Sequence, residues 1–116
     1  MNNLEKRLFD FAIRVIKYLR TLPDSTEYRV IKTQLTKSST SSGANYEEAQ
    51  AGSSKADFNN KTRISLREMR ESNYWLRILN EIIEPDSELL WLIQESLELK
   101  NILGSIVQKT RTIRQK

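Results

Sequence analysis

The chain has 116 residues, of which 29% are charged and 38% are hydrophobic, and its formal net charge is +4 at neutral pH. This length and composition predict a single folded domain with a modest core and exclude a disordered chain. The absence of cysteine and histidine excludes disulfide bonds, thiolate chemistry and the commonest zinc ligands and general bases.

The first predicted helix spans residues 3–22, and Pro23 ends it. Its apolar residues recur at alternating spacings of four and three, which defines one helical face: Leu4, Leu8, Phe11, Val15, Leu19 and Leu22. Acidic residues interrupt this pattern in the opening stretch MNNLEKRLFDF, which is unlike a signal peptide. Because no apolar run is long enough to span a membrane either, we expect a cytoplasmic protein without membrane contact.

The second predicted helix spans residues 25–51, with Asp24 and Glu27 as its capping box. It contains the stretch TKSSTSSGANYEEA, whose composition is typical of a linker. The helical spacing nevertheless continues through it without a break, in the series Ile31, Leu35, Ser38, Ser42, Asn45 and Ala49. A linker has no reason to keep this register, so we interpret the stretch as helix with a seam of small residues. That seam must pack closely against its own core or a neighbouring subunit, because such residues have low helix propensity.

The third predicted helix spans residues 55–84 and ends at Pro85. Gly52 is expected just beyond the end of the second helix, where glycine is common, and Ser54 and Asp57 form the next capping box. Apolar and small residues again follow a helical spacing, in the series Phe58, Thr62, Ser65, Met69, Ser72, Leu76, Leu79 and Ile83.

The fourth predicted helix spans residues 87–112, capped by Asp86 or Ser87. Its apolar residues cover most of its circumference, which indicates more than one buried face. Short turns between long helices favour antiparallel neighbours. We therefore predict an all-α fold for residues 1–116, an antiparallel up-down-up-down four-helix bundle. The second apolar face of the last helix is most easily buried by another subunit, so we expect a homo-oligomer.

Basic residues are concentrated near the two ends of the chain. Residues 1–41 hold eight Lys and Arg against four Asp and Glu, and residues 109–116 hold four against none. In an antiparallel bundle the start of the first helix and the end of the last one share one end of the molecule. The candidate phosphate-binding residues are Lys6, Arg7, Arg14, Lys17, Lys109, Arg111 and Arg114. The simpler interpretation is a solvated surface whose last basic residues favour a helix C-terminus.

Four glutamates near the middle of the second and third helices are the candidates for acid chemistry: Glu47, Glu48, Glu68 and Glu71. Carboxylates inside a bundle can bind metal ions, but the bundle sites of this class also use histidine, which the chain lacks. Ion pairs with Arg63, Arg67 and Arg70 are the favoured interpretation. No metal or other cofactor is expected.

Tyr46, Tyr74, Trp75 and Trp91 could stack on nucleobases, as aromatic residues in basic grooves do. They fall on or beside apolar stripes, however, so core or subunit-interface positions are favoured. The sequence contains no glycine-rich phosphate loop, nucleophile elbow or zinc-finger spacing.

The run from Ser42 to Leu79 resembles the 23S ribosomal RNA intervening-sequence protein family. The resemblance rests on Gly43-Ala44-Asn45, Glu48-Ala49, Ser54-Lys55-Ala56-Asp57-Phe58, Arg67-Glu68, Glu71 and Tyr74-Trp75-Leu76. It implies a four-helix bundle that assembles as a ring, typically a homopentamer, encoded within insertions in bacterial large-subunit ribosomal RNA genes or elsewhere in the genome. The family is similar in fold to the accessory variability determinant of diversity-generating retroelements, a basic ring that binds nucleic acid and a reverse transcriptase.

Composition, pattern and resemblance together predict a non-enzymatic, oligomeric module that contacts RNA or DNA phosphates without base specificity. One alternative is a structural adaptor ring that recruits a protein partner, such as a reverse transcriptase, without touching nucleic acid. A second is an enzyme or carboxylate-metal protein that uses Glu48, Glu68 and Glu71.

Overall fold

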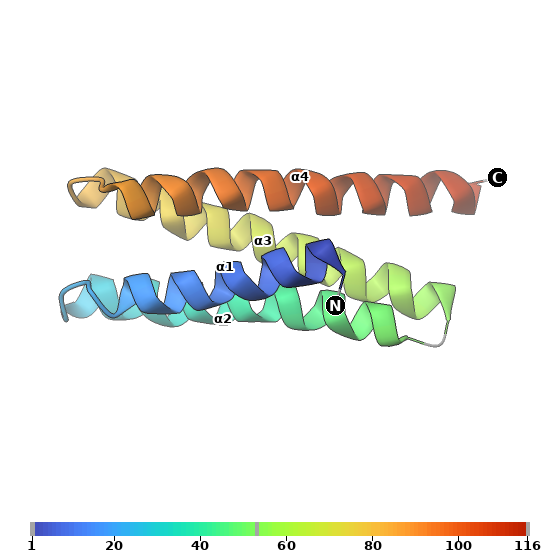
Figure 1. Cartoon of the computed structure of the whole chain (residues 1–116), viewed down its shortest axis with the longest axis horizontal. Helices are drawn as coiled ribbons and strands as arrows, with labels where there is room; N and C mark the ends of the chain where they lie inside the picture. The colour runs from blue at the N-terminus through green and yellow to red at the C-terminus, as the bar shows by residue number, and fades with distance from the viewer. Residues whose placement is uncertain (1, 53, 116) are drawn as a thin grey trace.

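The computed structural model describes residues 2–52 and 54–115, with side chains up to residue 111. Within this part of the chain four helices form: α1 (Asn3–Leu19), α2 (Thr26–Ala51), α3 (Lys55–Ile82) and α4 (Ser87–Gln115). Each helix packs on the next one along the chain, and α4 also packs on α1, so the four surround one core (Figure 1). The molecule is an elongated antiparallel four-helix bundle of 49 × 24 × 21 Å.

Turn and capping residues explain most of the helix ends. Ser54 Oγ accepts a hydrogen bond from the backbone N–H of Asp57 at 3.1 Å, which confirms the predicted cap of α3. Asp86 Oδ1 accepts from the N–H of Leu89 at 2.8 Å, so Asp86 caps α4. The first helix ends at Leu19, three residues earlier than predicted, because Thr21 folds back onto the carbonyl of Tyr18.

One of the predicted end signals is wrong, whereas Gly52 lies just beyond the end of α2 as expected. The capping box of Asp24 and Glu27 does not form: Ser25 occupies the N-cap of α2, and Asp24 instead accepts a hydrogen bond from Arg29 Nε at 2.7 Å. Gly52 is the C-cap of α2 with φ −66° and ψ 151°, which is extended backbone that any residue can adopt. An added Cβ would lie 2.5 Å from Asp57 Oδ2, so a larger residue here would require the Asp57 carboxylate to move.

The core combines a large apolar cluster with a layer of small polar residues. Fully buried apolar side chains come from all four helices: Leu8, Phe11, Val15, Leu35, Met69, Leu76, Leu79, Leu89, Leu92, Leu99 and Leu103. Serines join the helices at the level of this cluster: Ser38 and Ser72 share a hydrogen bond of 2.8 Å, and Ser42 Oγ donates to the Ser65 carbonyl at 2.8 Å. The serine stretch of α2 therefore faces α3 inside its own subunit.

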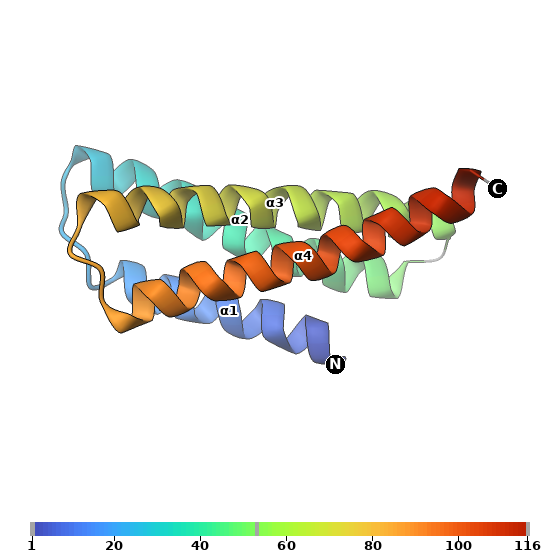
Figure 2. The same ribbon diagram turned by 90° about the horizontal axis from the view of Figure 1, so that it is seen from above.

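The helices differ in length, which leaves part of α4 without a neighbour on its α1 side. The first helix has 17 residues and α4 has 29. Figures 1 and 2 show α4 continuing well beyond the N-terminal end of α1. No helix in the described residues is both long and apolar enough to cross a membrane.

Candidate nucleic-acid interface

Two of the predicted phosphate-binding residues are already bound to carboxylates of α4. Arg7 donates to Glu95 at 2.6 and 3.1 Å and to Glu98 at 3.2 Å. Arg14 donates to Glu88 at 2.6 and 3.0 Å. These fork-shaped pairs raise the pKa of each arginine, chiefly through the hydrogen bonds to Glu95 and Glu88. Arg7 and Arg14 therefore hold α1 against α4, and their charge is compensated within the subunit.

Arg14 also covers an aromatic side chain of α4. Its guanidinium carbon lies 3.4 Å from the centre of the Trp91 ring, a cation–π contact. Trp91 remains 36% exposed at the edge of this contact. Arg14, Glu88 and Trp91 thus form one interlocked group, in which the charge of Arg14 is already compensated by a carboxylate.

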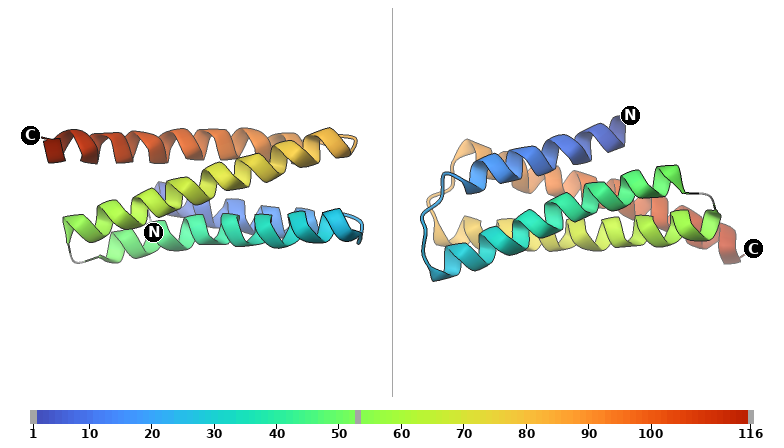
Figure 3. Two further views of the ribbon diagram at one scale, coloured as in Figure 1. Left: turned by 180° about the vertical axis from the view of Figure 1, so that it is seen from behind. Right: turned by 90° about the horizontal axis from the view of Figure 1, so that it is seen from below.

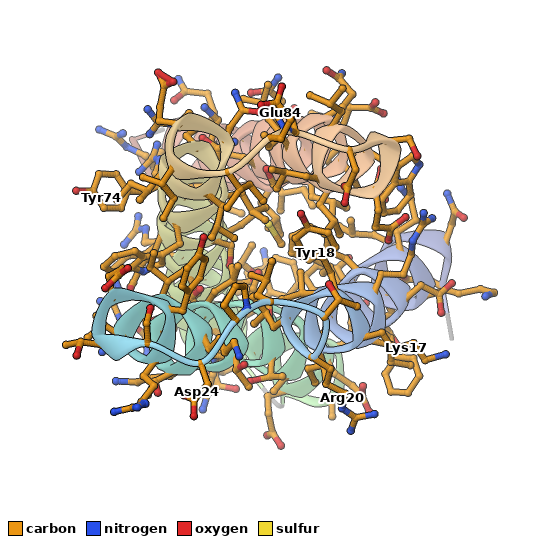
Figure 4. The ribbon with its side chains drawn as sticks, turned by 90° about the vertical axis from the view of Figure 1, so that its left-hand side faces the viewer. Lys17, Tyr18, Arg20, Asp24, Tyr74 and Glu84 are labelled. Carbon is orange, nitrogen blue, oxygen red and sulfur yellow. The ribbon has the colours of Figure 1, made fainter. Side chains whose placement is uncertain are left out.

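The other predicted basic residues lie far apart. Lys6 pairs with Asp10 at 2.8 Å on the surface of α1. Lys17 is exposed at the end of the bundle that carries the Pro23 turn (Figure 4), whereas Lys109 and Arg111 are exposed towards the C-terminus of α4. Lys109 follows Glu98, the partner of Arg7, by 11 residues, about 16 Å of helix. The side chain of Arg114 lies outside the described residues.

A second set of arginines, none of them among the predicted phosphate-binding residues, lies along the outer face of α3. We call Arg63, Arg67, Arg70 and Arg77 the α3 arginine row; all four are exposed. Arg63 and Arg70 form no ion pair with any residue whose side chain is described. Arg67 has a loose contact of 3.8 Å with Glu68, and Arg77 Nε donates to Asn73 Oδ1 at 2.9 Å. Most of this positive charge is therefore available to solvent.

The sequence spacing places the row opposite the buried face of α3. The buried residues Ser65, Met69, Ser72, Leu76 and Leu79 face the core. Positions 63, 67, 70, 74 and 77 follow each other at spacings of four and three on the opposite face. The row spans 14 residues from Arg63 to Arg77, about 21 Å of helix. The recurrence of arginine at spacings of four and three, outside the apolar positions, is the signal that could have identified the row in the sequence.

The four glutamates do not neutralise these arginines as expected. Among the described residues, Arg67 and Glu68 form the one ion pair between these glutamates and the α3 arginine row. Glu71 instead accepts a hydrogen bond from Trp75 Nε1 at 3.3 Å, and Glu47 and Glu48 are exposed. No three acidic side chains of the described part come together in an arrangement that could hold a metal ion.

The aromatic residues divide into core and surface. Tyr46 is buried and Trp75 is half-buried against the core, as favoured from the sequence. Tyr74 is not a core residue of the subunit: half of its side chain is exposed, and Figure 4 shows it pointing away from the bundle. It occupies the position between Arg70 and Arg77 in the row, so a basic and aromatic surface does exist on α3.

The other residues that carry the family resemblance have mainly structural positions. Gly43 lies at the contact between α1 and α2, where an added Cβ would make ordinary van der Waals contact with Leu8, at 3.5 Å from its Cβ. The Asn45 amide donates to the carbonyl of Ser41 at 2.9 Å within its own helix. Phe58 is half-buried near the start of α3.

An apolar groove of about 320 Å³ lies between α1 and α2, which run side by side (Figure 3). Its lining includes Phe9, Ala12, Ile13, Ile16, Gly43 and Ala44, with Glu5 and Glu47 as its acidic members. Phe9 is 51% exposed. This surface is suited to an apolar partner and carries no basic group of its own.

Comparison with known proteins agrees with the architecture and places the chain in a family. A crystal structure of a protein with unknown function from the S23 ribosomal protein family of Bacteroides thetaiotaomicron VPI-5482 superposes with a TM-score of 0.80 at 31% sequence identity. The match covers 90% of this chain and 97% of that one. No curated protein matches the sequence. The family model described as 23S rRNA-intervening sequence protein matches residues 2–105, and the chain belongs to this family.

Proposed function

We propose that this protein is a non-enzymatic, oligomeric module that binds RNA or DNA through the phosphate backbone. The observation that carries the proposal is the α3 arginine row, four exposed arginines on one helix face with few internal partners. Arginine donates several hydrogen bonds in a fixed fork that matches phosphate oxygens. Lys17, Lys109 and Arg111 are exposed and add further positive charge elsewhere on the surface.

The proposed contacts are to phosphates, so binding should depend on salt more than on sequence. Each phosphate neutralised releases counterions, and the logarithm of the affinity falls linearly with the logarithm of the salt concentration. Repetition of the row on every subunit of an oligomer would strengthen the attachment by multivalency. Arg7 and Arg14 contribute to the stability of the subunit rather than to this contact.

Fluorescence anisotropy with a labelled RNA and a labelled DNA, titrated at several salt concentrations, tests the proposal. The variant carrying Arg63→Gln, Arg67→Gln and Arg70→Gln should bind at least about 10-fold more weakly at low salt, with a shallower salt slope. The matched control carries Arg20→Gln, Lys37→Gln and Lys55→Gln, which remove the same charge from exposed positions outside the row. Absence of binding by the wild-type protein at low salt would refute the proposal, and so would equal losses in both variants.

The oligomer is part of the same proposal, with five subunits in a ring as the family resemblance implies. Its support is the apolar groove between α1 and α2, together with exposed apolar side chains such as Phe9 and Leu90. Exposed apolar side chains and an apolar groove are typical of an interface. Native mass spectrometry of the wild type should show a multimer, and Phe9→Asp should shift it towards the monomer. A monomeric wild type at micromolar concentration would contradict this part.

The alternative is an adaptor that recruits a protein partner without binding nucleic acid. The observation that favours it is again the groove between α1 and α2, because its lining is apolar and has no basic residue to attract a phosphate. The anisotropy titration distinguishes the adaptor from the nucleic-acid-binding module, because an adaptor would show no affinity for RNA or DNA at any salt concentration.

A further inference from the structure

We infer that the ligand of the α3 arginine row is a single strand, one base of which stacks on Tyr74. This inference rests on the proposed function and names the class of nucleic acid and the aromatic contact. It follows from three features of α3: the position and support of Tyr74, the burial of the helix flanks, and the linear order of the charges.

Tyr74 is an exposed aromatic side chain with a supported ring. Its ring lies edge-to-face against Trp75, with 5.2 Å between the ring centres and 75° between the planes. Trp75 is in turn bound to Glu71 through its indole N–H. The guanidinium carbon of Arg77 lies 5.8 Å from the centre of the Tyr74 ring. A ring oriented in this way and half exposed to solvent is a stacking surface that needs little ordering before a base binds.

The flanks of α3 are occupied by α2 and α4, which disfavours deep insertion of this helix into a duplex. On one side, Ser65 and Ser72 bond to α2, and on the other, Asn73 donates to Ser96 of α4 at 2.9 Å. A helix with its side chains is about 10–12 Å wide, and the major groove is about 12 Å wide and about 8.5 Å deep. A recognition helix projects from its domain into this groove, whereas α3 packs on α2 along one side and on α4 along the other. The outer side chains of α3 are thus its available contacts.

The linear order of the row fits one strand. Arg63, Arg67 and Arg70 precede Tyr74 along the face, and Arg77 follows it. Arg70 and Arg77 lie four and three residues from Tyr74, about 6 and about 4.5 Å along the helix axis. Phosphates on both sides of a stacked base can therefore reach an arginine. In a duplex the bases are paired and stacked on each other, so Tyr74 would have no free base face to contact.

The chosen experiment compares one labelled 12-nucleotide strand with the same strand annealed to its complement, by anisotropy at one low salt concentration. The wild type should bind the single strand at least about 10-fold more tightly than the duplex. Tyr74→Leu should lose about 10-fold or more of the single-strand affinity, because stacking on one aromatic residue is worth about 1–3 kcal/mol per base. Tyr74→Phe keeps the ring and should bind within about 3-fold of the wild type.

Val30→Ala is the control, because it shortens a comparably exposed apolar side chain of α2, outside both the row and the groove between α1 and α2. It should leave single-strand affinity unchanged. Equal or tighter binding of the duplex would overturn the inference while leaving phosphate binding intact. Unchanged affinity in Tyr74→Leu would overturn the stacking contact. A change in the native mass of Tyr74→Leu would assign this residue to a subunit contact and overturn the inference as well. Failure of the wild type to bind either ligand would refute the proposed function itself.

Discussion

Ser42 and Ser65 bind each other through both of their side chains. Ser42 Oγ donates to the carbonyl of Ser65 at 2.8 Å, and Ser65 Oγ donates to the carbonyl of Ser42 at 2.7 Å. Both residues are fully buried. This reciprocal contact brings the backbones of α2 and α3 close together, and it satisfies two hydroxyl groups that would otherwise be costly to bury. It explains why a stretch of low helix propensity lies at the centre of a long helix.

Ser42→Ala should lower the free energy of unfolding by about 1 kcal/mol, since one buried hydrogen bond is lost and no clash is created. Ser42→Leu should cost considerably more, because it forces a larger side chain between two closely packed backbones. Urea denaturation followed by circular dichroism measures both. Ser105→Ala, at an exposed site of α4, is the control and should be nearly neutral. Wild-type stability in Ser42→Leu would contradict the close approach of α2 and α3.

Gly43→Ala should be tolerated and should stabilise the protein by up to about 1 kcal/mol, because alanine has the higher helix propensity. The added Cβ would make ordinary van der Waals contact with Leu8, at 3.5 Å from its Cβ. Gly104→Ala is the matched comparison, since a Cβ there would have no neighbour within 4 Å. The change in thermal unfolding temperature of Gly104→Ala reports the helix propensity alone. The difference between the two variants then reports the contact of the added Cβ with Leu8. Destabilisation by Gly43→Ala alone would mean that α1 and α2 have no room for a methyl group.

The sequence predicts the helices well because their signals are local. Pro23 and Pro85 interrupt helices wherever they occur, and an unbroken heptad spacing identifies α2 as one helix. Which neighbour the serine seam of α2 faces cannot be predicted from the residues close to it in sequence. A small residue such as Ser42 fits its own core and a subunit interface equally well, and the choice depends on where Ser65 of α3 lies. The failed capping box has a similar cause, because Arg29 competes for the carboxylate of Asp24.

Charged partners were the least predictable feature of the candidate interface. The pairs of Arg7 with Glu95 and of Arg14 with Glu88 depend on the register between α1 and α4, which are distant in sequence. The net charge of residues 1–41 could not show that carboxylates of α4 neutralise these arginines. The α3 arginine row was missed for the opposite reason: acidic residues close in sequence suggested neutralisation, but Glu71 points to Trp75 instead of an arginine.

The ion pair between Arg7 and Glu95 should contribute to stability much more than the surface pair between Lys6 and Asp10. Glu95 is only 12% exposed and receives two hydrogen bonds from Arg7, whereas the side chains of Lys6 and Asp10 are 66% and 48% exposed. Double-mutant cycles with alanine, read from urea unfolding, should give a coupling energy above about 1 kcal/mol for the first pair. The second should give about 0.5 kcal/mol or less. Equal coupling energies would contradict this account of the α1–α4 contact.

Arg7→Ala should weaken the fold and leave nucleic-acid affinity almost unchanged, because its guanidinium is already bound to carboxylates. The same anisotropy assay measures the affinity under conditions where the variant remains folded. A loss of affinity as large as that of the triple variant of the α3 arginine row would show that phosphate competes successfully with Glu95. Arg7 would then belong to the nucleic-acid interface.

Tyr18 should make the protein sensitive to alkaline pH. Burial raises the pKa of its phenol to about 12, and the negative charge of Asp86 adds to the effect. Figure 4 shows Tyr18 pointing into the bundle, and its hydroxyl has no hydrogen-bond partner among the described residues. In the unfolded chain the phenol ionises near its ordinary value of about 10. The stability that depends on the neutral phenol is thus complete below about pH 10 and is lost as the pH rises towards 12.

Tyr18→Phe removes the ionisable group and should reduce this alkaline loss by about 2 kcal/mol, as judged from urea unfolding between pH 8 and pH 11.5. At pH 8 the substitution should be nearly neutral or slightly stabilising, because it deletes a buried hydroxyl without a partner. Tyr74→Phe removes a hydroxyl from a half-exposed tyrosine and should keep the wild-type pH profile. If Tyr18→Phe lost as much stability as the wild type between these pH values, the alkaline transition would have to come from other groups, and Tyr18 would not be ionising on unfolding.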